Sequence, residues 1–270
     1  MTCETRTREL PGARVAYDIG GDGPPVVLIH GWACRRADFA GVAADLRRDH
    51  RVITIDLPWH GDSTATALAW TLDDLGALVE AIVADEGMRG APLVGHSMGA
   101  AVALEAVLAG DGHRVIGLDG LTFMHMYPKQ SADRQDALLQ PYRVDFPAAV
   151  HALCRRACGP DTDPALTERI AGRMAEMDPE AGVRMLGALL EWDMDTALTR
   201  ADALGVDITV FAARPLLAPE VETAYGHRFG IVPVDLGGHF YLMERPAETA
   251  GLIRQALAEG TGTARAAPGN

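Results

Sequence analysis

Short β-rich runs alternate with helical stretches over the first 123 residues, and this alternation constrains the fold more than any other feature. The runs at 26–29 and 52–55, Val-Val-Leu-Ile and Val-Ile-Thr-Ile, are almost wholly apolar, which is typical of parallel strands buried on both faces. This alternation predicts an α/β fold with an open, mostly parallel, doubly wound sheet. The predicted strands are 13–19, 26–30, 52–56, 92–96 and 115–119, and the predicted helices are 38–48, 72–86 and 97–109.

The pattern changes after residue 123, because only helical stretches follow one another as far as residue 200. A sheet whose strands stop and later resume contains an insertion between two of those strands. The helices predicted within the insertion are 132–139, 146–158, 163–176 and 179–192. After it come predicted strands at 207–212 and 231–234 and a final helix at 246–258.

The chain is therefore expected to form one sheet domain that carries an insertion, which suits its length of 270 residues. We assign residues 1–123 and 201–260 to the core and residues 124–200 to a helical cap. Residues 261–270 are small or polar and include Pro and Gly, so a disordered tail is expected there.

Charge excludes several kinds of partner. The 24 lysines and arginines stand against 37 aspartates and glutamates, which gives a formal net charge of −13. A nucleic acid or an anionic membrane surface requires a basic face, so neither is an expected partner. The same acidic excess favours a small-molecule substrate that is neutral or apolar where it meets the protein.

The sequence contains no signal for export, for a membrane span or for a bound metal. The first residues lack an apolar stretch of signal-peptide length, and no run of about 18 apolar residues occurs, so a cytoplasmic protein is expected. The four cysteines are too few and too scattered for a disulfide scaffold. No second Cys/His pair completes a zinc site with Cys154 and Cys158, so we expect free thiols and no metal or organic cofactor.

The pentapeptide Gly95-His96-Ser97-Met98-Gly99 is the sharpest chemical signal in the chain. A β-rich run precedes it and a helical stretch follows it, so Ser97 falls on a strand-to-helix turn. Such a turn strains the serine backbone, and glycines two residues away on either side remove side chains that would collide there. The turn presents the Ser97 hydroxyl as a nucleophile beside the positive end of the next helix.

Together with two further loops, this pentapeptide resembles the α/β-hydrolase family over nearly the whole chain. The loop His30-Gly31-Trp32 and the segment 56–63, Asp-Leu-Pro-Trp-His-Gly-Asp-Ser, are similar to family motifs. The resemblance implies the α/β-hydrolase fold, with the helical cap inserted between the sixth and seventh strands. It also implies an oxyanion hole formed by the backbone N–H groups of Trp32 and Met98.

The segment 56–63 departs from the family pattern at one position, since Trp59 stands where relatives have glycine. We interpret Asp62 and Ser63 as turn residues that hold this loop, and His60 as a strut within it. Because the segment borders the pentapeptide, the Trp59 ring is expected either to narrow the acyl side of the pocket or to stack on a planar substrate.

The sequence Gly237-Gly238-His239-Phe240 follows the last predicted strand and resembles the histidine loop of the family. The resemblance makes His239 the general base, which takes the Ser97 proton and returns it to the leaving group. His30 and His96 flank motif loops, and structural hydrogen bonds are expected for both.

The acid that orients the histidine is where this chain departs most from its family. Most relatives place an aspartate after the seventh strand, where this chain has Arg214 and no carboxylate before Glu220. Asp119 is the preferred substitute, because it ends the sixth strand at the same edge of the sheet and some lipases of this fold use that strand. Glu220, or no acid at all, are the alternatives. Arg214 is either a surface residue or the partner of a carboxylate near the site.

The resemblance places the helical cap over the active site, where its methionines would form an adaptable apolar pocket. The alternative is that these side chains only pack the cap against the core. The residues expected to line the pocket are Trp59, Phe123, Met126, Tyr127, Trp192 and Phe240.

The function favoured by these residues is that of a serine hydrolase. It would cleave an ester, lactone or thioester of a moderately apolar small molecule through an acyl-enzyme on Ser97. A biosynthetic cyclase or acyltransferase, a carbon–carbon bond hydrolase, a cofactor-free perhydrolase and a ligand-binding receptor on the same fold remain alternatives.

Overall fold

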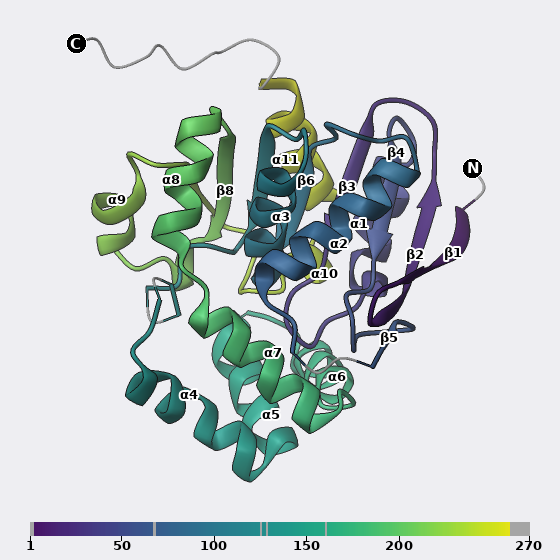
Figure 1. The fold of residues 1–270 in the computed structure, drawn as a ribbon. Helices are drawn as coiled ribbons and strands as arrows, with labels where there is room; N and C mark the ends of the chain where they lie inside the picture. The colour runs from purple at the N-terminus through teal and green to yellow at the C-terminus, as the bar shows by residue number, and fades with distance from the viewer. Residues whose placement is uncertain (1–2, 67–68, 125, 128, 160, 260–270) are drawn as a thin grey trace.

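The computed structural model describes residues 3–66, 69–124, 126–127, 129–159 and 161–259, so the tail expected at 261–270 lies outside the described residues. Strands from all parts of the described chain join in one sheet (Figure 1). Their bounds are β1 (Cys3–Leu10), β2 (Ala13–Gly20), β3 (Pro25–Ile29), β4 (Arg51–Ile55), β5 (Thr64–Ala65), β6 (Leu93–His96), β7 (Arg114–Leu118), β8 (Asp207–Ala213) and β9 (Gly230–Val234).

The strand order in the sheet is β1-β2-β4-β3-β6-β7-β8-β9, with the short β5 paired to β2 outside this path. From β4 to β9 all neighbouring strands run parallel, whereas β1 pairs with β2 and β2 pairs with β4 in antiparallel register. The predicted mostly parallel, doubly wound sheet is therefore confirmed. Because parallel strands end at the same edge, residues that follow β3, β6, β7, β8 and β9 meet there.

Helices cover both faces of the sheet. The helices α2 (Leu72–Asp85), α3 (Met98–Ala109) and α8 (Met194–Leu204) pack on one face, and α1 (Ala40–Leu46) and α11 (Pro246–Glu259) pack on the other. In β3, Val27 and Ile29 belong to the first hydrophobic core, whereas Val26 and Leu28 belong to the second. Successive side chains of a strand point to opposite faces, which is why this strand is apolar throughout.

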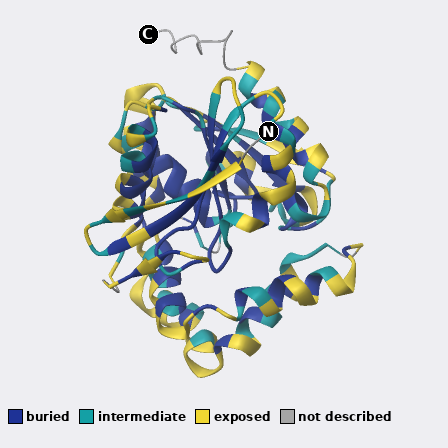
Figure 2. Cartoon of the chain, turned by 90° about the vertical axis from the view of Figure 1, so that its right-hand side faces the viewer, coloured by how far each residue is buried: buried dark blue, intermediate teal, exposed yellow. Residues whose placement is uncertain are grey.

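The insertion between β7 and β8 contains four helices that we call the cap helices: α4 (Ala132–Val144), α5 (Phe146–Ala157), α6 (Pro164–Met174) and α7 (Pro179–Glu191). They lie together below the sheet in Figure 1, and their outer surfaces are the exposed part of this region in Figure 2. Without the short β5, β7 and β8 are the sixth and seventh strands, as predicted. The segment predicted as insertion also includes the start of α8, which packs on α3 beside the sheet. No helix among the described residues is long and apolar enough to cross a membrane.

Several elements differ from the sequence prediction. The strand β1 has no apolar face, since its sequence Cys-Glu-Thr-Arg-Thr-Arg-Glu-Leu is mostly exposed, and only its pairing with β2 makes it a strand. The helix α4 runs to Val144 rather than ending before Pro141, so the structure keeps this proline inside the last turn of the helix. Short elements that the sequence did not predict are a 3₁₀ turn at Arg36–Phe39, a second at Arg214–Leu216, α9 (Glu220–Tyr225) and α10 (Tyr241–Glu244).

The loop after β4 is held by the buried carboxylate of Asp56. This carboxylate accepts hydrogen bonds from the backbone N–H groups of Arg36 (2.6 Å) and Asp62 (2.9 Å), and it pairs with the Arg36 guanidinium. Gly61 has a φ of 54°, and a Cβ there would lie 2.1 Å from the Asp56 carboxylate, so no other residue fits. The Ser63 hydroxyl donates to the Asp56 carbonyl at 2.7 Å. Asp62 and Ser63 therefore act as the turn residues that the sequence indicates.

Two buried histidines join this loop to the loop after β3. The Nε2 atom of His30 accepts from the N–H of Leu57 at 3.0 Å, and the Nε2 atom of His60 accepts from the N–H of Ala33 at 3.1 Å. Each ring also hydrogen-bonds a main-chain carbonyl through Nδ1, so both rings are neutral, with the proton on Nδ1. Burial lowers the pKa of His30 to about 4 and that of His60 to about 3.

These two histidines make the folded state sensitive to acid. Their pKa values lie below the ordinary 6.5, so the unfolded chain binds more protons than the folded chain as the pH falls below that value. We expect the free energy of unfolding to decrease between about pH 6.5 and pH 4.5, with each histidine contributing up to about 1.4 kcal/mol per pH unit. Urea unfolding at a series of pH values measures this slope.

The variant His60→Gln keeps a donor and an acceptor but cannot titrate, so the slope should become smaller by up to about 1.4 kcal/mol per pH unit. The exposed His113 provides the matched control, and His113→Gln should leave the slope unchanged. An equal slope in wild type and His60→Gln would contradict the assignment.

Candidate active site

Ser97 lies at the turn between β6 and α3 in a conformation that few residues adopt. Its φ of 53° and ψ of −122° lie outside the regions that residues with a side chain normally occupy. The preceding strand ends at His96 and the helix starts at Met98, so the turn has no other residue to absorb the change of direction. The side chain is partly accessible and lines a cavity.

The glycines on either side of Ser97 are required by direct backbone contact. A Cβ on Gly95 would lie 2.1 Å from the carbonyl oxygen of Gly99. A Cβ on Gly99 would lie 2.3 Å from the carbonyl oxygen of Ile29, in the neighbouring strand β3. Both glycines therefore permit the close approach that the turn needs, for the steric reason that the sequence suggested.

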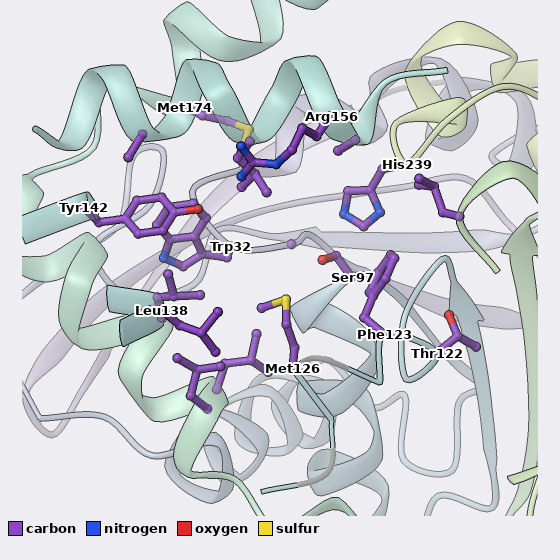
Figure 3. Close-up of a pocket in the computed structure, with 18 of the residues that line it drawn as sticks. Trp32, Ser97, Thr122, Phe123, Met126, Leu138, Tyr142, Arg156, Met174 and His239 are labelled. Carbon is purple, nitrogen blue, oxygen red and sulfur yellow. The ribbon is translucent and has the colours of Figure 1, made fainter. Parts of the chain in front are cut away.

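The structure places His239 against Asp119, which is 120 positions away in the chain. The Nδ1 atom of His239 lies 2.6 Å from Oδ2 of Asp119, and Oδ1 of the same carboxylate accepts from the Ala213 N–H at 2.8 Å. An ionised carboxylate only accepts hydrogen bonds, so Nδ1 carries the proton and Nε2 of the neutral ring has a free lone pair. Ser97 and His239 line the same cavity, with the hydroxyl and the imidazole facing it (Figure 3).

The turn that carries Asp119 is strained as well. Asp119 has a φ of 47° and Leu121 a φ of 62°, although neither is glycine. The Asp119 N–H bonds the Phe211 carbonyl at 2.9 Å, so the turn begins directly from the pairing of β7 with β8. A Cβ on Gly120 would lie 2.7 Å from the carbonyl oxygen of Ser97, which shows how closely this turn approaches the serine. Two left-handed residues, one on each side of Gly120, are the backbone strain that accompanies the placement of this carboxylate at the histidine.

The backbone of His239 is fixed on both sides. Its N–H donates to the carbonyl of Ala157, the last residue of cap helix α5, at 2.7 Å. Its carbonyl lies 2.9 Å from Nε2 of His96, which must donate this bond, so the proton of the neutral His96 ring is on Nε2. Burial lowers the pKa of His96 well below its ordinary range, and the neighbouring His239 adds to this effect. The imidazole position thus depends on the pentapeptide and on the cap.

Of the two predicted oxyanion donors, one is at the start of α3 and the other is on the loop after β3, beside Ser97. Met98 is the first residue of α3, so its N–H has no partner in the preceding turn of the helix. A Cβ on Gly31 would lie 3.0 Å from Cβ of Ser97, which places the backbone leading to Trp32 next to the serine. The indole N–H of Trp32 donates to the carbonyl of Gly182 in α7 at 2.8 Å. Trp32 therefore ties its loop to the cap.

A cavity of about 840 Å³ opens beside Ser97 and His239, between the sheet edge and the cap helices. Its volume lies within the range of small-molecule sites. Most of its wall is apolar and comes from α4, α5 and α7 together with Trp32 and Phe123 (Figure 3). Phe123, Met126 and Phe240 line it, as do Met124 and Met174.

Three residues predicted for the pocket are not among the described residues that line it. Trp192 is buried, and its indole N–H donates to Glu105 of α3 at 2.7 Å. Tyr127 is 2% exposed and packs edge-on against Trp192, with 5.9 Å between ring centroids. Trp59 has a φ of 67° and packs against the main core, which explains why relatives have glycine at this position. A buried indole N–H needs an acceptor, and here Glu105 rather than a substrate provides it.

Arg214 and Glu220 occupy the region where relatives have their acid. Arg214 is 58% exposed, and its guanidinium donates to Asp235 at 2.7 Å, so it forms a surface ion pair. Glu220 is exposed at the rim of the cavity, whereas Nδ1 of His239 is already bonded to Asp119. Of the two carboxylates considered from the sequence, the structure brings only Asp119 to the histidine.

Ion pairs that the sequence analysis did not identify join residues 124–200 to the rest of the sheet domain. Asp38 is buried and pairs with Arg173 of α6 at 2.6 Å. Glu105 accepts from Arg200 of α8 at 3.2 Å in addition to its bond with Trp192, and burial raises its pKa. A lone glutamate in an otherwise apolar helix is the sequence signal that marks Glu105. No group of metal-binding side chains occurs among the described residues.

Comparison with known proteins shows the family of the chain. The sequence profile of the alpha/beta hydrolase family matches residues 26–252. The chain is 31% identical to a pimeloyl-(acyl-carrier protein) methyl ester esterase of Methylococcus capsulatus over 231 residues, which are 82% of this chain and 82% of that protein.

Solved structures show the same fold at lower identity. A thermophilic esterase from Thermogutta terrifontis has a TM-score of 0.77 and 22% identity over 96% of this chain and 99% of its own. The enol-lactonase from Burkholderia xenovorans has a TM-score of 0.78 and 18% identity over 94% of this chain and 100% of its own. On the match over residues 26–252 and the identity to the methyl ester esterase, the chain belongs to the alpha/beta hydrolase family.

Proposed function

We propose that this protein hydrolyses esters of moderately apolar small molecules through an acyl-enzyme formed on Ser97. The observation that carries the proposal is the 2.6 Å bond between His239 and Asp119 at a cavity that Ser97 also lines. Family membership supports hydrolysis, and the methyl ester esterase, the thermophilic esterase and the enol-lactonase support an ester or lactone as the bond cleaved.

In the first half-reaction, Nε2 of His239 takes the hydroxyl proton of Ser97 as the oxygen attacks the ester carbonyl. Asp119 holds the ring in this orientation and stabilises the imidazolium that forms. The backbone N–H groups of Met98 and Trp32 stabilise the oxyanion of the tetrahedral intermediate. The C–O bond to the alcohol then breaks, and His239 gives its proton to the leaving oxygen.

In the second half-reaction, His239 removes a proton from water as the water oxygen attacks the acyl carbonyl on Ser97. The tetrahedral intermediate forms in the same place and is stabilised by the same N–H groups. When it collapses, the C–O bond to Ser97 breaks, the acid leaves and the proton returns to the Ser97 oxygen. The cavity wall of Leu, Ala and Met side chains favours an apolar substrate, because burial removes that surface from water.

The nucleophile can be tested directly. A fluorophosphonate probe should add one phosphonyl group to the wild-type protein, and peptide mass analysis should place it on Ser97. The variant Ser97→Ala should not be labelled, and its turnover of p-nitrophenyl butyrate should be lower by on the order of 10³-fold or more. An adduct on another residue, or an unchanged rate in Ser97→Ala, would refute the proposed nucleophile.

The same assay separates this function from a ligand-binding receptor and from a cyclase or acyltransferase. A ligand-binding receptor would show no turnover of p-nitrophenyl butyrate by the wild-type protein. A cyclase or acyltransferase would release a cyclised or transferred product in place of the free acid, which product analysis by mass detects.

The acid is tested by comparing Asp119→Asn with Glu220→Gln. An amide at 119 offers one acceptor oxygen to the two donors that the carboxylate binds, Ala213 N–H and His239 Nδ1–H. We expect kcat to decrease at least roughly 100-fold in Asp119→Asn and to stay within about threefold of wild type in Glu220→Gln.

Thermal unfolding of both variants shows whether Asp119→Asn is folded at the assay temperature. The rate of fluorophosphonate labelling should decrease in parallel with kcat, since both depend on the activated hydroxyl. Equal losses of kcat in the two variants, or a larger loss in Glu220→Gln, would be incompatible with Asp119 as the acid.

A further inference from the structure

One arginine projects into a cavity that is otherwise mostly apolar. Arg156 lies near the end of cap helix α5 and is, with Glu220, one of the two residues with a permanent charge that line the cavity in the described chain. Figure 3 shows its side chain extending from the His239 side of the cavity toward Trp32 and Tyr142. A guanidinium in this position would interact with any molecule that fills the cavity.

The Arg156 guanidinium has no acidic partner within the described part of the protein. Some arginines of the cap do have one, such as Arg173 with Asp38 at 2.6 Å and Arg184 with Glu180 at 3.0 Å, whereas Arg155 has none among the described residues either. No hydrogen bond or ion pair of Arg156 occurs among the described residues, and Glu220 is not within 4.0 Å of it. Its donors are therefore available to a ligand.

The hydroxyl of Tyr142 provides a second donor near this guanidinium. Tyr142 comes from α4, and its ring packs edge-on against Trp32 with 5.3 Å between ring centroids, so its position is fixed. Burial raises the pKa of Tyr142 and keeps the phenol protonated, while the nearby Arg156 charge acts in the opposite direction. The hydroxyl makes no hydrogen bond to another described residue, and Tyr142 lines the cavity.

We propose that Arg156 and Tyr142 bind a carboxylate on the substrate, remote from the ester that Ser97 attacks. This inference rests on the proposed function and extends it to one substrate class: monoesters that carry a second, free carboxylate, joined to the ester by an apolar chain. A guanidinium binds a carboxylate through two parallel N–H···O bonds, and the phenol can donate a third. One guanidinium matches the single charge of a carboxylate, whereas a phosphate monoester would bring nearly two charges to one cation.

The net charge of −13 favoured a substrate that is neutral or apolar where it meets the protein, whereas Arg156 favours a substrate with one anionic end. A net charge describes the field far from the protein, whereas recognition in a cavity depends on the charges that line it. The apolar wall between Ser97 and Arg156 would hold the chain of the substrate, and the guanidinium would fix its far end.

The experiment compares esters that differ only in a terminal carboxylate. One pair has the charge on the acyl part: the mono-p-nitrophenyl ester of octanedioic acid and p-nitrophenyl octanoate. The other pair has it on the alcohol part: the butyrate ester of 8-hydroxyoctanoic acid and octyl butyrate. In wild type, kcat/KM should be higher for the charged member of at least one pair.

In Arg156→Gln, kcat/KM for that charged ester should decrease by roughly tenfold or more, chiefly through KM, and the uncharged ester should change by less than about threefold. Tyr142→Phe keeps the ring that packs on Trp32. Its preference for the charged over the uncharged ester should decrease less than that of Arg156→Gln. In wild type the preference should also decrease with added salt, because screening weakens the attraction between the two charges.

Arg155→Gln is the matched control, since Arg155 and Arg156 are both exposed neighbours on the same helix but only Arg156 is among the residues that line the cavity. Arg155→Gln should leave kcat/KM unchanged for both the charged and the uncharged ester of each pair. The inference is overturned if wild type has a higher kcat/KM for neither charged ester. It is also overturned if Arg156→Gln and Arg155→Gln lower kcat/KM for the charged ester equally. Hydrolysis of the uncharged esters that depends on Ser97 would still support the proposed function in either case.

Discussion

The geometry around Ser97 depends on one buried carboxylate, whose two oxygens join segments that are far apart in the chain. Asp119 is 1% exposed, and it accepts from Ala213 N–H at 2.8 Å and meets Nδ1 of His239 at 2.6 Å. An unpaired carboxylate at this depth would be costly, so both bonds stabilise its buried position. The left-handed backbone at Asp119 is the strain that this placement requires, and Ser97 carries similar strain.

The cap helices bond directly to residues of the proposed active site. The carbonyl of Ala157, at the end of α5, accepts from the N–H of His239, and Gly182 of α7 accepts from the indole of Trp32. The cap therefore fixes both the histidine and the loop that leads to one predicted oxyanion donor. Any movement of α5 or α7 would change the position of these groups as well as the shape of the cavity.

Three buried polar side chains at the sheet edge are bonded within the protein, and two polar side chains of the cavity have no such partner among the described residues. The loop backbone donates hydrogen bonds to the side chains of His30, His60 and Asp56, which makes the edge rigid. Arg156 and Tyr142 face the cavity without such partners among the described residues. Rigid loops beside unpaired donors are what a site needs if it is to recognise a polar group in a fixed place.

The sequence by itself determined the sheet, the insertion and the serine turn, because these follow from local patterns: apolar strands buried on both faces, and glycines at 95 and 99 that direct contact requires. It also indicated Asp119, since residues that end parallel strands share one edge. Which carboxylate meets His239 was decided only by the tertiary structure, because the register of β7 against β8 sets where that side chain points. The same holds for Trp192, whose indole faces Glu105 rather than the cavity: a buried N–H turns toward whichever acceptor the packing brings near, and that acceptor lies 87 positions away in the chain.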